Sequence, residues 1–192
     1  MTRTKAVIFD CFGVLTADGL KHLREEFWGN DSASSKHIYD MSKAVNAGYL
    51  GYDQFVSEIS KMSGLQIDEV RQRINGASPN NVLFEYIRDG LREKTKIGML
   101  SNAADDWLNT LFSEWQVRLF DEIVLSYQVG AVKPEHAMYQ AITQRLGVGF
   151  EECVFIDDSE SYCRAAQNLG MSTIWHQDTH DTIAKLRELV DA

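Results

Sequence analysis

The sequence predicts an α/β fold, in which a Rossmann-like parallel sheet carries helices on both faces and is interrupted by a helical insertion. In the second half of the 192-residue chain, short apolar runs alternate with segments of helical periodicity. That alternation is typical of a parallel sheet with helical crossovers. Between residues 18 and 80 no strand-like run occurs, and apolar residues recur at helical spacing. These two observations place the insertion after the first strand of the sheet.

The first element is expected to be a short strand. The run "KAVIFDCF" at residues 5–12 is rich in β-branched and aromatic residues and is followed by a glycine, which favours a buried strand that ends in a turn. In the insertion, Phe55, Ile59 and Met62 lie on one face of a predicted helix. The dense break "NGASPNN" at residues 75–81 ends the insertion.

After this break, helices and strands alternate to the end of the chain. We expect strands at residues 96–102, 121–126, 152–158 and 171–175, and helices around residues 82–91, 105–114, 137–146 and 183–190. A further helix is expected through Ala165 and Leu169, ending near Gly170. Sheets of this kind bind ligands at the carboxyl ends of their strands, near the point where the strand order reverses.

The composition indicates a globular protein and excludes several classes of function. Hydrophobic residues make up 44% of the chain, and no apolar run approaches the roughly 20 residues of a membrane helix. The N-terminal segment lacks the features of a signal peptide. Three cysteines without a CxxC spacing favour a reducing cytoplasm over a disulfide framework or a zinc site. Because the formal charge is −9, a nucleic-acid partner is not expected. The lack of a long apolar run means that a membrane is not expected as a partner either.

Polar side chains follow the apolar strands at the points where those strands end. They are Asp10 after the first strand, Ser101 and Asn102 after the second, and Asp157 and Asp158 after the fourth, and the loop "GAVKPE" adds Lys133. Because the carboxyl ends of parallel strands meet at one edge of the sheet, these groups should lie together. Nucleophilic and metal-assisted chemistry uses such carboxylates, hydroxyls and cations.

The four segments that carry these groups resemble the four motifs of the haloacid-dehalogenase-like (HAD) hydrolase superfamily. "FDCFGVL" is similar to the first motif, "LSN" to the second, Lys133 in "VKPEHAMY" to the third, and "FIDDS" to the fourth. Order and spacing match over nearly the whole chain. In detail the chain looks like the subgroup that holds small sugar-phosphate phosphatases, the phosphatase domain of soluble epoxide hydrolases and the 2-haloacid dehalogenases.

This resemblance implies two parts and a substrate class. Residues 1–15 and 81–192 would form the HAD-like α/β core, and residues 16–80 would form the small helical cap that the superfamily inserts between its first two motifs. The cap selects the substrate in such proteins, and residues 16–80 carry no readable motif. The resemblance therefore implies a small phosphorylated metabolite as partner, and a chain that is a monomer or a homodimer.

The resemblance also implies a reaction and a metal. Asp10 would attack phosphorus to give an aspartyl-phosphate that water then cleaves. Mg²⁺ would be held by Asp10, Asp158 and the backbone carbonyl of Phe12, and it would offset the repulsion between the anionic nucleophile and the anionic phosphate.

The remaining motif residues would bind and orient the substrate. Ser101 would donate a hydrogen bond to a phosphoryl oxygen, and Lys133 would supply a positive charge to the same group. Asp157 would stand beside the metal and orient its ligands or waters. Asn102 would help to shape the substrate pocket.

The sequence departs from the superfamily at Phe12. Most of its phosphatases carry a second Asp there, which protonates the leaving oxygen and then activates water. General acid–base catalysis of this kind contributes about 10²–10⁴-fold in rate. A substrate with a leaving group of low pKa needs this help least, and Asp18 is a candidate substitute. Tyr162 stands where close relatives often carry Asn.

Two alternatives remain open. Dehalogenases of this family carry an aromatic residue at the position of Phe12, because halide leaves without a proton. They bind an anionic halocarboxylate without Mg²⁺, however, and two uncompensated carboxylates such as Asp157 and Asp158 would repel it. The other alternative is a weakly active or non-catalytic HAD-like protein that binds a ligand. Phosphatase chemistry is favoured over both.

Overall fold

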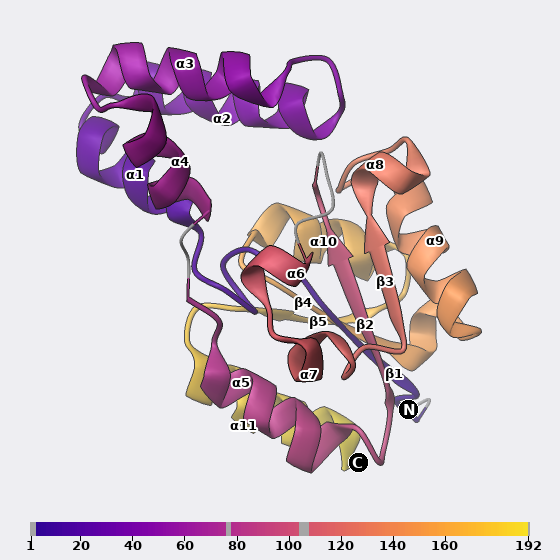
Figure 1. Cartoon of the computed structure of the whole chain (residues 1–192). Helices are drawn as coiled ribbons and strands as arrows, with labels where there is room; N and C mark the ends of the chain where they lie inside the picture. The colour runs from indigo at the N-terminus through magenta and orange to yellow at the C-terminus, as the bar shows by residue number, and fades with distance from the viewer. Residues whose placement is uncertain (1–2, 76–77, 104–107, 192) are drawn as a thin grey trace.

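The structure, a computed structural model, describes residues 3–75, 78–103 and 108–191 and contains a five-stranded parallel sheet (Figure 1). The strand order is β3-β2-β1-β4-β5. The strands are β1 (Ala6–Phe9), β2 (Lys96–Ser101), β3 (Glu122–Leu125), β4 (Cys153–Asp157) and β5 (Ser172–Trp175). Every strand expected from the sequence is present, so the predicted α/β fold is confirmed.

Helices cover both faces of the sheet. On one face pack α5 (Asn81–Tyr86) and α11 (Thr179–Val190), whereas α9 (His136–Leu146) and α10 (Glu160–Asn168) pack on the other. The sheet therefore forms the middle layer of three.

The central strand β1 explains why both faces are covered. All four of its residues are completely buried, with no surface accessible to solvent. Val7 and Phe9 join the apolar cluster on the α5 and α11 side, and Ala6 and Ile8 join the cluster on the α9 side. This alternation follows from the two-residue period of a strand. Because both faces of β1 are packed, the strand also holds the next residue, Asp10, in a fixed position.

The helix that was expected around residues 82–91 is irregular in its second half. After α5 the chain continues as a π-helical turn at Ile87–Leu91, which the hydrogen bond from the Arg92 N–H to the Ile87 carbonyl oxygen closes at 3.0 Å. A bond to the fifth preceding residue is wider than the α-helical one and marks a local bulge.

The helix that was expected around residues 105–114 is divided. Residues 105–107 lie outside the described residues, α6 covers Leu108–Leu111, and α7 begins anew at Glu114–Val117. The N–H and hydroxyl of Ser113 donate to Gln116 Oε1 at 2.9 and 2.8 Å. This capping arrangement starts a new helix. Two short elements were not expected, namely α8 (Ser126–Val129) and a 3₁₀ turn at Phe150–Glu152.

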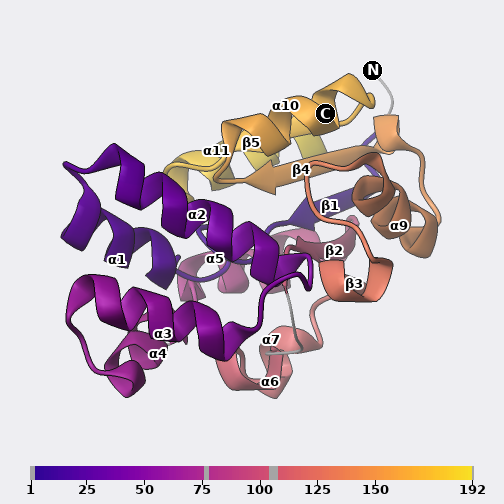
Figure 2. The same cartoon turned by 90° about the horizontal axis from the view of Figure 1, so that it is seen from above.

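Four helices between β1 and α5 form a separate layer on the side toward which the strands point (Figures 1 and 2). They are α1 (Gly19–Trp28), α2 (Ser32–Asn46), α3 (Tyr52–Ser63) and α4 (Ile67–Asn75). Each contributes to one apolar cluster, for example through Leu23, Ile38, Phe55 and Val70. We call these four helices the cap. Within the described residues, no helix combines the length and the apolar character needed to cross a membrane.

The two connections between core and cap run side by side. Thr16 and Pro79 form an isolated β-bridge. The Asn80 N–H donates to the Leu15 carbonyl oxygen at 2.8 Å, and the Thr16 hydroxyl donates to the Ser78 carbonyl oxygen at 3.2 Å. Because the chain enters and leaves the cap at one place, the cap stays close to the end of β1.

The strand order reverses at β1. From this strand the chain adds β2 and β3 on one side, and then β4 and β5 on the other. The register pairs Phe9 with Met99 of β2 and with Ile156 of β4. The residues that follow Phe9 and Ile156 are therefore neighbours, and they lie at the switch point where such sheets bind ligands.

Candidate active site

Asp10 lies at the carboxyl end of β1, where its backbone still continues the sheet. Its N–H donates to the Ile156 carbonyl oxygen at 2.8 Å, and its side chain is buried. Oδ1 accepts a hydrogen bond from the Cys11 N–H at 2.7 Å and lies 2.7 Å from Lys133 Nζ. These contacts hold the carboxylate in one orientation, as a nucleophile requires.

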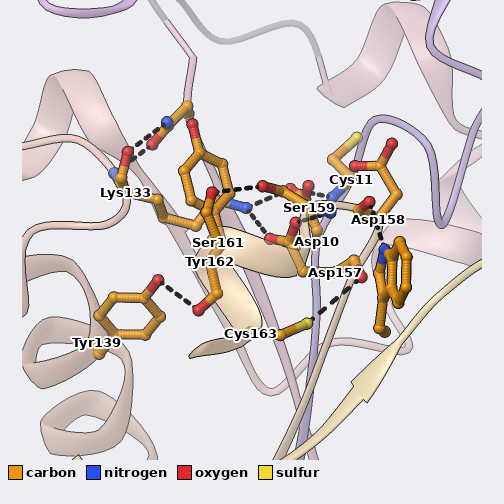
Figure 3. A network of polar contacts seen from close by, with 12 residues as sticks. Asp10, Cys11, Lys133, Tyr139, Asp157, Asp158, Ser159, Ser161, Tyr162 and Cys163 are labelled. Carbon is orange, nitrogen blue, oxygen red and sulfur yellow. Dashed lines mark hydrogen bonds and ion pairs between the residues drawn. The ribbon is translucent and has the colours of Figure 1, made fainter. Parts of the chain in front are cut away.

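Lys133 is the centre of a buried ion triad (Figure 3). Its Nζ lies 2.7 Å from Asp10 Oδ1 and 2.7 Å from Asp157 Oδ2, and its side chain is almost fully inaccessible to solvent. A buried ion is stable only when it is paired and hydrogen-bonded. The triad therefore requires the ends of β1 and β4 and the loop before α9 to be in place together.

Burial and charge act against each other in this triad. Burial raises the pKa of Asp10, repulsion from Asp157 raises it further, and attraction to Lys133 lowers it in part. Burial disfavours the charged form of Lys133, but Asp10 and Asp157 outweigh this effect and raise its pKa. Lys133 is thus an ammonium ion at neutral pH. The two buried acids share a single cation, so a second cation would favour the ionised form of Asp10.

Asp157 and Asp158 differ in their surroundings. Asp157 has no accessible area, and its second oxygen, Oδ1, accepts the Ser159 N–H at 2.8 Å. Asp158 is partly exposed, and its Oδ2 lies 3.0 Å from the ammonium of Lys21 in α1. The Trp175 indole N–H donates to the Asp158 carbonyl oxygen at 2.9 Å. Both oxygens of Asp157 are therefore engaged by the protein, whereas Asp158 faces the cap.

The acidic groups fit a magnesium ion. One oxygen from each of Asp10, Asp157 and Asp158 lies within 4.8 Å of the others. Mg²⁺ takes oxygen ligands at about 2.0–2.1 Å, so ligands on opposite sides of the ion are roughly 4 Å apart. Gly13 approaches this group closely, since a Cβ there would lie 2.6 Å from Cγ of Asp158. The chemistry and spacing of these donors suit Mg²⁺.

Ser101 ends β2 with a buried hydroxyl. Within the described residues, its buried Oγ has no hydrogen-bond partner. A buried polar group without a partner costs about 1–3 kcal/mol, so this hydroxyl is available to a ligand. Asn102 has the opposite character. Its Oδ1 accepts the Lys133 N–H at 2.7 Å, and its Nδ2 donates to the Lys133 carbonyl oxygen at 3.2 Å.

Three further residues that the sequence singled out lie around the triad. Phe12 is half-buried and packs against the apolar cluster on the α5 side of the sheet. Asp18 caps α1, where its Oδ1 accepts the Lys21 N–H at 2.9 Å. Burial raises the pKa of Asp18, the hydrogen bond from Lys21 opposes this, and the charge of Asp158 adds to the rise. The ring of Tyr162 lies 5.2 Å from Lys133 Nζ.

Two residues that contact Asp158 were not predicted from the sequence. Lys21 reaches Asp158 across 137 positions of the chain, and no local pattern marks such a pairing. Gly13 has a φ of +85°, a conformation that side chains disfavour. The glycine in "FDCFGVL" could have been recognised as a point of close approach.

Most of the chain is similar to proteins of known family. A family model described as haloacid dehalogenase-like hydrolase matches residues 4–170, which include every residue of the triad. The sesquiterpene phosphatase astK of Aspergillus oryzae is 26% identical over 204 residues, with 98% of each chain covered. The wild-type HAD family enzyme bt-2542 of Bacteroides thetaiotaomicron, solved with magnesium and inorganic phosphate, shares 26% identity at a TM-score of 0.64, covering 91% of this chain and 94% of that one.

The dehalogenase branch is also similar in structure. The L-2-haloacid dehalogenase of Xanthobacter autotrophicus superimposes with a TM-score of 0.66 at 19% identity, covering 98% of this chain and 83% of that one. At this identity the likeness shows the fold, and the reaction has to be argued from the site.

We predict that Gly13→Ala disturbs the acidic group more than its backbone conformation alone would. The new Cβ would lie 2.6 Å from Asp158 Cγ, so the carboxylate must move. Gly48→Ala is the matched control, because Gly48 has a similar φ of +77° and its Cβ would meet no atom within 4 Å. Because of the left-handed backbone, Gly48→Ala should lower the free energy of unfolding by about 1–2 kcal/mol. Gly13→Ala should lower it by more, since the Asp158 carboxylate must also move. Urea unfolding measures the difference, and equal losses would contradict the close approach.

Proposed function

We propose that this chain, which belongs to the haloacid dehalogenase-like hydrolase family, is a magnesium-dependent phosphatase that acts on a small phosphorylated metabolite through an aspartyl-phosphate on Asp10. The observation that carries the proposal is the grouping of a buried carboxylate, the Lys133 ammonium and the unsatisfied Ser101 hydroxyl beside further acids. The phosphatase named among the relatives and the neighbour solved with magnesium and phosphate support it.

Asp10 is the nucleophile in this proposal. Its Oδ1 is held by Cys11 and Lys133, which leaves Oδ2 to attack phosphorus. The new bond joins Oδ2 to phosphorus while the bond between phosphorus and the leaving oxygen breaks, and that oxygen departs with the electron pair. Water then attacks the aspartyl-phosphate, releases inorganic phosphate and restores the carboxylate.

Lys133 and Ser101 stabilise the phosphoryl group. The Lys133 ammonium, already beside Asp10, offers a fixed positive charge to oxygens on which negative charge develops. The Ser101 hydroxyl donates a hydrogen bond to the same group and thereby gains the partner that it lacks within the described residues. Asn102 acts through Lys133, since both of its polar atoms hold the Lys133 backbone. This assignment makes Asn102 a positioning residue at the edge of the substrate pocket.

Asp10, Asp158 and the backbone carbonyl of Phe12 would hold Mg²⁺. When bound, the ion offsets the repulsion between the Asp10 carboxylate and the phosphate dianion and polarises a phosphoryl oxygen. Asp157 supports this site indirectly, because its two oxygens are engaged by Lys133 and Ser159.

Dehalogenation fits these residues less well. A 2-haloacid is itself an anion, and without a metal ion it would bind beside three carboxylates, which lie within 4.8 Å of one another and pair with only two cations, Lys133 and Lys21. Coulomb repulsion between unit charges at about 4 Å is roughly 4 kcal/mol at the effective dielectric of a protein surface. A phosphate with its metal ion removes that conflict, so phosphoryl transfer is the better match.

The first test removes the nucleophile. We expect Asp10→Asn to abolish turnover of every phosphate ester that the wild-type protein cleaves, because an amide does not attack phosphorus. Asp53→Asn, which changes an exposed carboxylate of the cap paired with Arg71, serves as the control and should keep its rate. Released phosphate is measured, and melting curves verify that both variants are folded. Unchanged turnover by Asp10→Asn would rule this mechanism out.

The second test addresses the metal. At 100 times its Kd, a ligand that binds only the folded state adds about 2.7 kcal/mol, which raises the Tm by roughly 5–10 °C for a chain of this size. We expect Mg²⁺ to produce such a rise and Asp158→Asn to abolish it. Lys21→Met should keep the rise, because it removes the ammonium that pairs with Asp158 and leaves the carboxylate in place. A wild-type Tm that does not respond to Mg²⁺ would exclude the metal site.

The third test concerns Phe12. Without an acid at this position, we expect aryl and acyl phosphates, whose leaving groups have low pKa values, to react much faster than alkyl phosphates. Phe12→Asp should raise the rate on alkyl phosphates by at most about 10²–10⁴-fold, with a smaller gain on aryl phosphates. Phe12→Asn removes the same apolar packing without adding an acid and is the control. If wild-type rates do not depend on the leaving group, another residue already supplies the proton.

A further inference from the structure

The basic residues of the cap divide into two sets. The cap segment, residues 16–80, contains seven Lys and Arg residues. Four of them form ion pairs with carboxylates of the cap itself: Lys36 with Asp40, Lys61 with Glu58, Arg71 with Asp53 and Asp68, and Arg73 with Glu26 and Glu69. The charges of this first set are compensated locally, so they add little to the field outside the cap.

The second set consists of Lys21, Arg24 and Lys43. Lys21 pairs with Asp158 of the core. For Arg24 and Lys43, no carboxylate of the described residues lies within ion-pair distance, and both cations instead flank one aromatic ring. The Arg24 guanidinium carbon lies 5.1 Å and Lys43 Nζ lies 4.3 Å from the centre of the Tyr39 ring. Two positive charges thus gather around Tyr39.

Tyr39 connects these cations to the candidate active site. Burial and a hydrogen bond with the Tyr39 side chain raise the pKa of the Tyr162 phenol. The Tyr162 ring in turn lies 5.2 Å from Lys133 Nζ, and Lys133 contacts Asp10. Tyr39 belongs to α2, whose last residue, Asn46, accepts a hydrogen bond from the Ser126 hydroxyl of the core at 3.3 Å. The cationic pair therefore lies on the cap side of the phosphoryl site.

Arg24 is held in place by two hydrogen bonds, and within the described residues they engage only part of its guanidinium. Its Nε donates to the Ser35 carbonyl oxygen at 3.1 Å, and its Nη2 donates to the Ser35 hydroxyl at 3.2 Å. A guanidinium carries five N–H donors, so three remain after these two bonds. A pre-positioned guanidinium loses little entropy on binding an anion, and its planar geometry suits carboxylate and phosphate groups.

We propose that Arg24, Lys43 and Tyr39 form a second anion-binding subsite, which selects phosphate esters whose leaving group carries another anionic group. This inference rests on the proposed phosphatase function and adds the substrate class. The reacting phosphate occupies the core beside Asp10 and Lys133, and the organic part extends past Tyr162 toward α2. A carboxylate or a second phosphate at its far end then meets Arg24 and Lys43. Uncharged alcohols gain nothing there.

The test uses aryl phosphates, the class expected to react fastest, whose rings carry a side chain of equal length that ends in a carboxamide, a carboxylate or a second phosphate. The carboxamide is the neutral match of the carboxylate, and the third compound distinguishes the two anions. For each, kcat/KM is measured with Mg²⁺, and the Kd of the corresponding non-hydrolysable phosphonate is measured by titration calorimetry. The wild-type protein should prefer the anionic compounds over the carboxamide about tenfold or more, as expected for charge-assisted hydrogen bonds.

Variants assign this preference to the subsite. Lys43→Met and Arg24→Gln should each reduce the preference about 3–10-fold, because the distal anion loses a partner. Lys61→Met removes a cap cation that is already paired with Glu58 and should change neither value. The wild-type preference should also shrink as salt rises from 0.05 to about 0.5 M.

The two measurements separate this inference from the function on which it rests. If the protein hydrolyses none of the esters but binds the anionic phosphonates more tightly than the carboxamide, and Lys43→Met removes that difference, the subsite stands and the phosphatase proposal fails. If the phosphonates bind equally or not at all, or if Lys61→Met lowers the preference as much as Lys43→Met, the subsite is overturned whatever the turnover.

Discussion

The buried ion pairs of Lys133 are the interaction on which the rest of the site depends. Its ammonium lies 2.7 Å from a carboxylate oxygen of Asp10 and 2.7 Å from one of Asp157. These two acids lie at the ends of the adjacent strands β1 and β4. Removing one partner of a buried pair leaves an uncompensated charge and costs about 3–5 kcal/mol. The register of β1 with β4 must therefore be correct before the triad can form. The two hydrogen bonds between the Asn102 side chain and the Lys133 backbone serve the same end, because they fix the loop that carries the cation.

This constraint also limits the chemistry. Lys133 is shared by two acids, so the site gains from a further positive charge. Phe12, which could have been acidic, packs its ring into the apolar cluster instead. The site is thus well provided with charge stabilisation and poorly provided with a general acid. A reaction in such a site should depend on how readily the leaving oxygen departs, and its substrates are best sought among phosphates whose leaving groups are already activated.

Most of the core could be predicted from the sequence, because its signals are local. Buried parallel strands are continuous apolar runs, and each of the predicted runs is a strand. The grouping of Asp10, Lys133 and Asp157 followed from the rule that carboxyl ends of parallel strands meet at one edge. The pairing of Lys21 with Asp158 could not be predicted, since it depends on how the cap docks. The division between α6 and α7 was also missed, because side-chain capping by Ser113 overrides the helical periodicity.

The cap shows why net charge is a poor guide to the substrate. The chain carries a formal charge of −9, which taken alone would disfavour any anionic ligand. Solvent-exposed charges are screened beyond about 8–10 Å at ordinary ionic strength, however, so a ligand responds mainly to the groups that surround it. Lys36, Lys61, Arg71 and Arg73 pair with acids of the cap, whereas the cations around Tyr39 have no such partners within the described residues. An acidic protein can therefore gather positive charge at one place, and here Arg24 and Lys43 gather it around Tyr39 on the cap.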